Sequence, residues 1–398
     1  MRPAEGRRGL GNCICARGLI YFSAMKKTLH SVLSFACAAS CVLTSAAAGT
    51  SAADDVPGRP PQESPHRRGF VVVTDYVAAD GRTDVSDALQ GLIEANPNRT
   101  LYFPDGTYLL AKPIATPAAP RRSVDLQLSN YAVLKAAPGW SGTEAMVRLG
   151  GIYPANDIRT PGSCYSFSGG IIDGSGVAKG ISIDSGRETK VRCVSMKNVL
   201  VGLHIKHGAN SNSSDCDIAD VNIVGNNAPN SIGVFIEAHD NTLSNMRICG
   251  VNIGVKLTGG GNLMQNIHPL SGQGPNNVGF MDLASNIYRC CYSDHFDVGF
   301  ILAGRSVLDS CWAWWYSDVV HGKDARRIAV KCPGAFTAHI TSMRIGFRGM
   351  KGTNVVLDAA RPGGDGFFMF PILDERLVNE TEKSYLRHLV RSRQLIGK

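Results

Sequence analysis

One short pattern recurs six times between residues 180 and 302: a glycine, an apolar residue, any residue and a second apolar residue. The copies begin at Gly180, Gly202, Gly233, Gly254, Gly279 and Gly299. Their glycines lie 22, 31, 21, 25 and 20 positions apart, and the fifth copy, which ends at Leu283, reads as stretched by one residue. Self-similarity at a period of roughly 20 to 50 residues is the signature of a solenoid.

The spacers between these copies favour coils of β-structure over helices. Each unit is too short for a strand-helix-strand crossover, and the spacers lack a helical period of about 3.6 residues. They are rich in Gly, Asn and Ser, which suit the tight corners of a coil. A strand that returns to the same place once per coil predicts a parallel β-helix.

The pattern also places a column of side chains on the surface of the predicted solenoid. Successive side chains of a strand point to opposite faces, and neighbouring strands lie about 4.8 Å apart. The outward positions are Ser182, Asp184, His204, Lys206, Phe235, Glu237, Lys256, Thr258, Met281, Ile301 and Ala303. Opposite charges in such a column pair across the ladder, which is a structural interpretation. The functional interpretation makes Glu237, His204 and Lys206 candidate catalytic residues, with His204 or Lys206 as general base.

The first 48 residues distort the charge of the chain. The net charge is +8, but this segment holds six basic residues against Glu5, a net of +5, so the remainder carries +3. No basic stripe is left outside the segment, and the sequence therefore predicts no nucleic-acid partner.

The same segment has the features of an export signal. From Met25 it reads as two lysines, an apolar run from Leu29 to Leu43 and small residues up to Ala53. The run is too short for a membrane-spanning helix. We therefore expect a secreted or periplasmic protein, with a lipoprotein acylated at Cys41 as the alternative.

Composition divides the chain into five regions. Residues 1–53 form an upstream extension and signal peptide, 54–69 a linker, 70–119 an N-terminal cap, 120–370 the parallel β-helix and 371–398 a C-terminal cap or tail. Within the cap, Asp84 to Ala95 reads as a helix with Asp84 as its N-cap. Such a helix would cover the open end of the solenoid, whose unpaired strand edge would otherwise invite aggregation.

The cap also carries a family resemblance. The segments Asp75–Asp84, Ala88–Gln90 and Leu101–Tyr108 resemble the N-terminal signature of the pectate-lyase superfamily. That superfamily includes rhamnogalacturonase, polygalacturonase and epimerase-like proteins and phage tailspikes. The resemblance implies an all-β solenoid, a right-handed single-stranded parallel β-helix with an N-terminal capping helix. Trimers are frequent among similar proteins, so it leaves a homotrimer open.

A second group of candidate residues lies near the C-terminal end of the repeats. Cys290–Asp297 is rich in polar side chains, and Ser310–His321 follows one coil later with three tryptophans. Exposed aromatic rings beside carboxylates suit a sugar-binding groove, whereas buried rings would only close a coil. The candidate substrate-binding residues are Trp312, Trp314, Trp315, Tyr316, His295 and His321.

Glycoside hydrolysis requires a pair of carboxyl groups, about 5 to 9.5 Å apart depending on the stereochemistry. Asp294 and Asp297, or either with Asp318 of the next coil, are the candidate catalytic acids. The polygalacturonase motifs Asn-Thr-Asp, Gly-His-Gly and Arg-Ile-Lys are missing, as are the arginine segment and calcium-binding aspartates of classical pectate lyases. The family motifs therefore do not select an activity.

The cysteines give no sign of a metal site. Eight follow the leader, and none forms a paired C-x-x-C or lies near a histidine cluster. Cys193 and Cys216, like Cys291 and Cys311, are about one coil apart, so we expect buried thiols stacked in the interior. The sequence predicts no metal and no cofactor.

Three functions remain open from the sequence, all with a polysaccharide or oligosaccharide as partner and without a membrane span. The first is an exported glycoside hydrolase with Asp294 and Asp297 as acid and base. The second is a lyase or epimerase on a uronate polymer, with Lys206 or His204 as base. The third is a non-catalytic protein that binds glycan or takes part in exopolysaccharide assembly.

Overall fold

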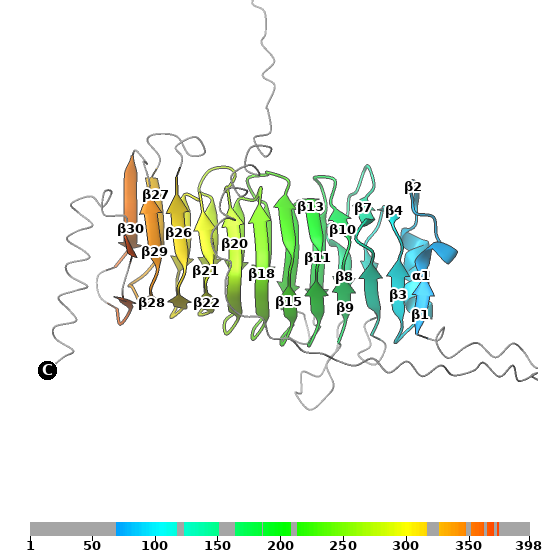
Figure 1. Ribbon diagram of the computed structural model, residues 1–398, viewed down its shortest axis with the longest axis horizontal. Coiled ribbons are helices and arrows are strands. Elements are labelled where there is room, and N and C mark those ends of the chain that lie inside the picture. The colour runs from blue at the N-terminus through cyan, green and yellow to red at the C-terminus, as the bar shows by residue number, and fades with distance from the viewer. Residues whose placement is uncertain are drawn as a thin grey trace, which may run out of the picture. The chain divides into compact units, whose positions relative to one another are not determined.

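The computed structural model describes residues 69–117, 123–150, 164–184, 186–207, 213–316, 326–347, 352–361 and 364–369, and the backbone of 372–373. The expected signal peptide, almost all of the linker, and all of the C-terminal cap after residue 373 lie outside these residues. The described part is a right-handed parallel β-helix, in which every strand pairing is parallel (Figure 1).

Three rows of strands form the walls of the solenoid, and we call them faces 1, 2 and 3. Face 1 is the ten-stranded sheet: β5 (Ile114–Ala115), β8 (Ala145–Leu149), β11 (Lys179–Asp184), β14 (Val201–Lys206), β17 (Ile232–Ile236), β19 (Ile253–Leu257), β21 (Val278–Asp282), β24 (Val298–Leu302), β27 (Arg326–Cys332) and β30 (Thr353–Ala359).

Faces 2 and 3 belong to one continuous sheet of 22 strands. Face 2 contains β1 (Phe70–Val72), β3 (Thr100–Phe103), β6 (Asp125–Leu128), β9 (Ser166–Ser168), β12 (Lys190–Arg192), β15 (Asp217–Ala219), β22 (Ile287–Arg289), β25 (Val307–Asp309), β28 (His339–Thr341) and β31 (Phe367–Met369). Face 3 contains β2 (Asp80–Asp84), β4 (Gly106–Leu110), β7 (Ala132–Ala136), β10 (Ile171–Asp173), β13 (Ser195–Val199), β16 (Asn222–Gly225), β23 (Tyr292–Asp294), β26 (Trp312–Trp315), β29 (Arg344–Phe347) and β32 (Ile372–Leu373). The long strands β18 (Thr242–Cys249) and β20 (Leu263–Leu270) cross from face 2 to face 3.

The six glycine-led copies are strands of face 1, as the repeat predicts. Their glycines lie opposite one another in register. These positions hold glycine because a side chain would collide with the backbone of the next coil. A Cβ atom built on Gly180 would lie 2.6 Å from the carbonyl oxygen of Gly202, and one on Gly254 would lie 2.5 Å from that of Gly279. These glycines are therefore required by close approach of strands rather than by an unusual backbone angle.

The prediction that the fifth copy contains an extra residue is wrong. Strand β21 stays in register, with Asp282 opposite Leu257 and Leu302, while Leu283 is 46% exposed. Asp282 thus occupies an interior position that the other copies fill with an apolar residue. Its carboxylate is fully buried and accepts hydrogen bonds from the hydroxyls of Tyr288 and Ser306, at 3.0 and 2.6 Å, with two more from nitrogen donors. These bonds replace the water that a buried charge would otherwise require.

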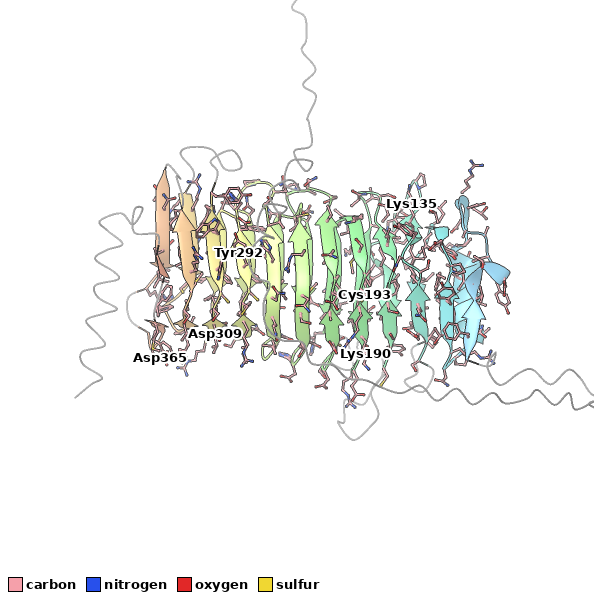
Figure 2. The ribbon with its side chains drawn as sticks, in the orientation of Figure 1. Lys135, Lys190, Cys193, Tyr292, Asp309 and Asp365 are labelled. Carbon is pink, nitrogen blue, oxygen red and sulfur yellow. The ribbon has the colours of Figure 1, made fainter. Side chains whose placement is uncertain are left out.

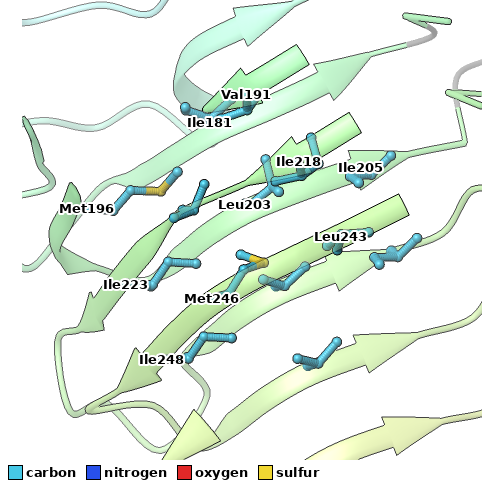
Figure 3. Packing of buried hydrophobic residues seen from close by; sticks show 14 of the residues in the cluster. Ile181, Val191, Met196, Leu203, Ile205, Ile218, Ile223, Leu243, Met246 and Ile248 are labelled. Atoms are coloured by element: carbon cyan, nitrogen blue, oxygen red, sulfur yellow. The ribbon is translucent and has the colours of Figure 1, made fainter. Parts of the chain in front are cut away.

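One large hydrophobic cluster fills the described solenoid from Val71 to Phe368, and a small second cluster contains Val278, Val298 and Ile328 of face 1. Buried side chains at equivalent strand positions stack from one coil to the next, as Ile181 and Leu203 do on face 1 (Figure 3). Cys216, Cys291 and Cys311 are buried in this interior, as expected, and all are free thiols. Cys193 is exposed, which corrects the predicted stacking with Cys216. It occupies the corner between faces 2 and 3 with a left-handed backbone (φ +57°).

The N-terminal end is covered by helix α1 (Ser86–Ala95), seen at the blue end of Figure 1. The helix begins two residues later than the sequence suggested, because Asp84 still belongs to strand β2. The Asp84 carboxylate accepts hydrogen bonds from the backbone N–H and the hydroxyl of Ser86, at 3.0 and 2.5 Å. Leu89, Leu92 and Ile93 pack into the core from the covered side of the helix.

Candidate functional site

An outward row of aromatic and charged side chains crosses four coils of face 3. We call it the aromatic strip: His268, Tyr292, Asp294, Trp312, Trp314 and Arg344. Strand register creates it, since Tyr292 lies opposite Trp312, which lies opposite Arg344, while Asp294 lies opposite Trp314. Tyr292 marks the position of the strip in Figure 2.

The rings of the strip pack against one another. The His268 and Tyr292 rings stack with centroids 4.2 Å apart, and the edge of Tyr292 meets Trp312 at 5.4 Å. The Arg344 guanidinium lies 4.8 Å from the Trp312 ring and 5.1 Å from the Trp314 ring. Such cation–π contacts hold the rings in place. Trp312 is nevertheless 39% exposed, so its surface is open to a ligand.

A glycine makes room for the second tryptophan of the strip. Gly346 lies opposite Trp314 on the next strand, and a Cβ atom built there would lie 2.2 Å from the Trp314 ring. Any side chain at this position would displace the indole.

Asp294 is the carboxylate of the strip and sits between two imidazoles. Its Oδ2 atom lies 3.6 Å from Nε2 of His268, and its Oδ1 atom lies 3.8 Å from Nε2 of His295. The side chain is 13% exposed, and within the described structure Oδ1 is buried without a hydrogen-bond partner. Burial, together with the nearby charge of Asp294, raises the pKa of Tyr292, so its hydroxyl stays protonated.

Two more of the expected residues adjoin Asp294. His295 is buried with a left-handed backbone (φ +57°), and its Nε2 accepts a hydrogen bond from the Tyr316 backbone N–H at 3.2 Å. The Tyr316 ring meets the His295 ring edge-on at 4.2 Å and is 60% exposed. Tyr316 is thus at the surface of this region, while His295 is buried behind it.

Trp315 has a different position from the other tryptophans. It is fully buried, stacks on Phe347 at 4.7 Å and donates a hydrogen bond from Nε1 to the Phe296 carbonyl at 2.8 Å. Because strand side chains alternate, Trp315 points inward where Trp314 points outward. Its expected role in substrate binding is therefore wrong.

Asp297 lies at the corner between faces 3 and 1 rather than on the strip. Its Oδ2 atom accepts hydrogen bonds from the backbone and side-chain nitrogens of Asn277, both at 3.2 Å, and its own N–H donates to that side chain at 2.7 Å. These contacts assign it a role in holding consecutive coils together. The other two expected residues of this region, Asp318 and His321, lie outside the described residues.

The second set of expected residues forms an ionic cluster on face 1. The Asp184 carboxylate binds Arg148 at 2.8 Å and lies 3.5 Å from the Lys206 ammonium, which in turn binds Glu144 at 2.7 Å. The contact with Lys206 lowers the pKa of Glu144. These contacts follow the structural interpretation of the outward column, in which opposite charges pair across strands.

His204 and Glu237 lie beside this cluster, with Nε2 of His204 3.2 Å from the Glu237 carboxylate. The His204 ring stacks on Phe235 at 4.6 Å, and Lys256 covers Phe235 at 4.7 Å. Burial lowers the pKa of His204, although Glu237 opposes the shift. The imidazole is therefore neutral near pH 7, as a base must be.

Sequence reasoning missed His268, Tyr292 and Arg344. Tyr292 carried a signal, since it falls within the segment Cys290–Asp297. His268 and Arg344 lie in segments with no motif, and they reach the site only through strand register. Across the described residues, no group of three or more His, Cys, Asp or Glu side chains is arranged to hold a metal ion.

A family model described as rhamnogalacturonase A/epimerase, pectate lyase-like, matches residues 70–279. The match covers more than half of the chain, so this protein belongs to that pectate-lyase-like family. The resemblance of the N-terminal cap is thereby confirmed. No curated protein sequence matches the chain.

Solved structures share the fold at low identity. The tailspike of E. coli bacteriophage HK620, in complex with a pentasaccharide, has a TM-score of 0.54 and 10% identity over 76% of this chain and 66% of the tailspike. Alginate lyase from Paenibacillus sp. str. FPU-7 has a TM-score of 0.51 and 15% identity over 69% and 97%. An exopolygalacturonase from Thermotoga maritima has a TM-score of 0.45 and 13% identity over 77% and 92%. The chain spans about two thirds of the tailspike.

In the described part of the chain, no helix is both long and apolar enough to cross a membrane.

Proposed function

We propose that this chain is an exported protein that binds and cleaves a polysaccharide at the aromatic strip of face 3. One observation carries the proposal. A mostly buried carboxylate, Asp294, lies between His268 and His295 and opposite Trp314, whose ring centroid is 6.4 Å from that of the exposed Trp312. Sugar rings present apolar faces to aromatic side chains, and a buried acid beside them is suited to proton transfer at the glycosidic oxygen.

Glycoside hydrolysis is the first form of this activity. Asp294 would act as general acid or base, with the His268 and His295 rings on either side of its carboxylate. A hydrolase needs a second carboxyl group. Asp297 and Asp318 remain the candidates from the sequence, and the bonds of Asp297 to Asn277 favour Asp318 for this role.

A polysaccharide lyase or epimerase acting on uronate residues is the second form, and Arg344 favours it. The guanidinium next to Trp312 supplies a positive charge where a uronate carboxylate would lie on the ring. Abstraction of the proton beside that carboxylate becomes easier when its charge is neutralised. In this form, His268 would be the base, and the His204–Lys206 group of face 1 would be a separate alternative.

Family membership and the printed functions of two fold relatives support a glycan as partner. The tailspike is in complex with a pentasaccharide, and the Paenibacillus protein is an alginate lyase. The leader that begins at Met25 supports export, because its two lysines, apolar run and small residues are the features of a secretory signal.

The test is digestion of a panel of neutral and acidic polysaccharides with the wild type and the Asp294→Asn variant. We expect the variant to lose at least about 100-fold in rate, since general acid–base catalysis contributes that much. Its melting temperature should stay close to that of the wild type. A lyase creates an unsaturated bond that absorbs in the near ultraviolet, whereas hydrolase products do not absorb there.

Two results would overturn the proposal. An Asp294→Asn variant with full activity would remove the site from face 3. Binding of glycans without any product would make the chain a binding protein, the third function left open by the sequence. Asp309→Asn serves as a matched control, since this aspartate is exposed on face 2 and outside the strip.

A further inference from the structure

Face 2 changes character along the axis of the solenoid. In its N-terminal half, β1 carries the exposed Phe70 at the first outward position, and the next six strands carry polar residues there, as at Lys190, Asp217 and Thr242. In the next five coils the same position holds Leu263, Ile287, Val307, His339 and Phe367, which we call the apolar stripe. Both halves have the same backbone, so the fold itself does not require this difference.

The apolar stripe is open to solvent. Ile287, Val307 and Phe367 are 40%, 37% and 37% exposed. The five residues of the stripe lie on successive strands about 4.8 Å apart, so the stripe extends for roughly 19 Å. Leu263, Ile287 and Val307 are apolar on three consecutive strands, and the ring of His339 on the next strand stacks on Phe367 at 4.3 Å. Single exposed apolar residues are ordinary, but a row of this kind marks an interaction surface.

We propose that the apolar stripe is the surface through which two copies of this chain form a dimer. The two-fold axis lies in the interface, parallel to the strands, and passes between β22 and β25. Rotation about such an axis reverses the order of the coils and keeps each position along the strand. Ile287 of one copy therefore packs on Val307 of the second copy, and the reverse contact forms at the same time.

The charges beside the stripe select this axis. The second outward position of the same strands holds Gln265, Arg289, Asp309 and Thr341. With the axis between β22 and β25, Arg289 faces Asp309 of the second copy, and this ion pair forms twice. An axis through β22 would instead place Arg289 against Arg289 of the second copy. An axis through β25 would place Asp309 against Asp309 of the second copy. Like charges at such close range are unfavourable.

Arg289 and Asp309 also lie opposite each other on neighbouring strands of one copy, so the interface would hold four charges of alternating sign. Among the described residues, the Arg289 guanidinium makes no hydrogen bond or ion pair, and Asp309 accepts bonds only from the hydroxyls of Ser310 and Thr341. Asp309 and the more distant Lys190, both labelled in Figure 2, lie along the same row of strands. The aromatic strip lies on face 3, around the corner from this contact, and stays open in the dimer.

Sedimentation equilibrium of the full chain tests the proposal. We expect the wild type to be a dimer and Arg289→Asp to raise its dissociation constant by ~10-fold or more, because two repulsive pairs replace two attractive ones. The double variant Arg289→Asp/Asp309→Arg restores the opposite charges and should return the dissociation constant towards the wild-type value. Lys190→Asp, on the same face but outside the stripe, should leave it unchanged.

Arg289→Asp and Lys190→Asp each place an aspartate opposite another one on the neighbouring strand of the same copy, so both should melt slightly below the wild type, whereas the double variant should melt as the wild type does. A wild type that is monomeric or trimeric would overturn the proposal. So would a double variant no better than Arg289→Asp alone, since only the stated axis pairs these two residues across the interface.

Discussion

At the scale of single residues, the alternation of a strand decides what neighbouring tryptophans do. Trp314 and Trp315 are adjacent in the chain, yet the first lies on the surface beside Arg344 and the second is fully buried against Phe347. The same rule separates Asp282, which is buried with four hydrogen bonds, from the exposed Leu283. Residue type alone would have placed the acid outside and the leucine inside.

The two kinds of tryptophan predict opposite effects of substitution. Trp315→Ala should lower the free energy of unfolding by about 3 to 5 kcal/mol, because it leaves a cavity in the core. Trp312→Ala should change stability little and weaken glycan binding instead. Denaturant unfolding and glycan affinity, measured on both variants, check this. The expectation fails if Trp312→Ala is the less stable of the two.

At the scale of elements, polar columns at the corners bind each coil to the next. Asn241, Asn262 and Asn286 are buried at equivalent corners before face 2, and each side-chain oxygen accepts from the backbone N–H of the preceding coil. The Asn262 amide nitrogen also donates to the Ala238 carbonyl at 3.0 Å. Corners without regular backbone pairing are satisfied in this way, which buried polar groups require.

Removal of one member of this column should be costly. Asn262→Ala leaves the Asn241 N–H and the Ala238 carbonyl with fewer bonds, and should lower the free energy of unfolding by about 3 kcal/mol. Asn266→Ala is the matched control, since Asn266 is exposed at the other corner with φ +51° and its loss should cost about 1 kcal/mol. Equal losses in urea unfolding would contradict the importance of burial.

At the scale of the whole molecule, one continuous core extends through all the described coils, so its two ends are the sites where strands lack partners. Helix α1 covers the N-terminal end and contributes Leu89, which is fully buried. Coverage of this kind keeps the edge of a sheet from pairing with other chains. Stability and solubility are therefore linked at this end.

Disruption of the cap should produce aggregation as well as lower stability. Leu89→Asp places a charge in the apolar contact and should lower the free energy of unfolding by more than ~3 kcal/mol. Light scattering should then rise with protein concentration below the melting temperature. Ala88→Asp, at the exposed neighbouring position, should do neither. A soluble, well-dispersed Leu89→Asp variant would show that α1 is dispensable as a cover.

The amino-acid sequence was sufficient to predict the β-helix, because the glycine column repeats a contact that every coil must make. It was also sufficient to predict the capping helix and to point to Asp294 and the tryptophans as a candidate site. Only the tertiary structure decided that His268 and Arg344 join that site, that Trp315 does not, and that Asp282 lies in the core. The physical reason is strand register. The turns between strands vary in length, so the pattern of residues within one strand does not specify which residues of the next coil lie opposite it.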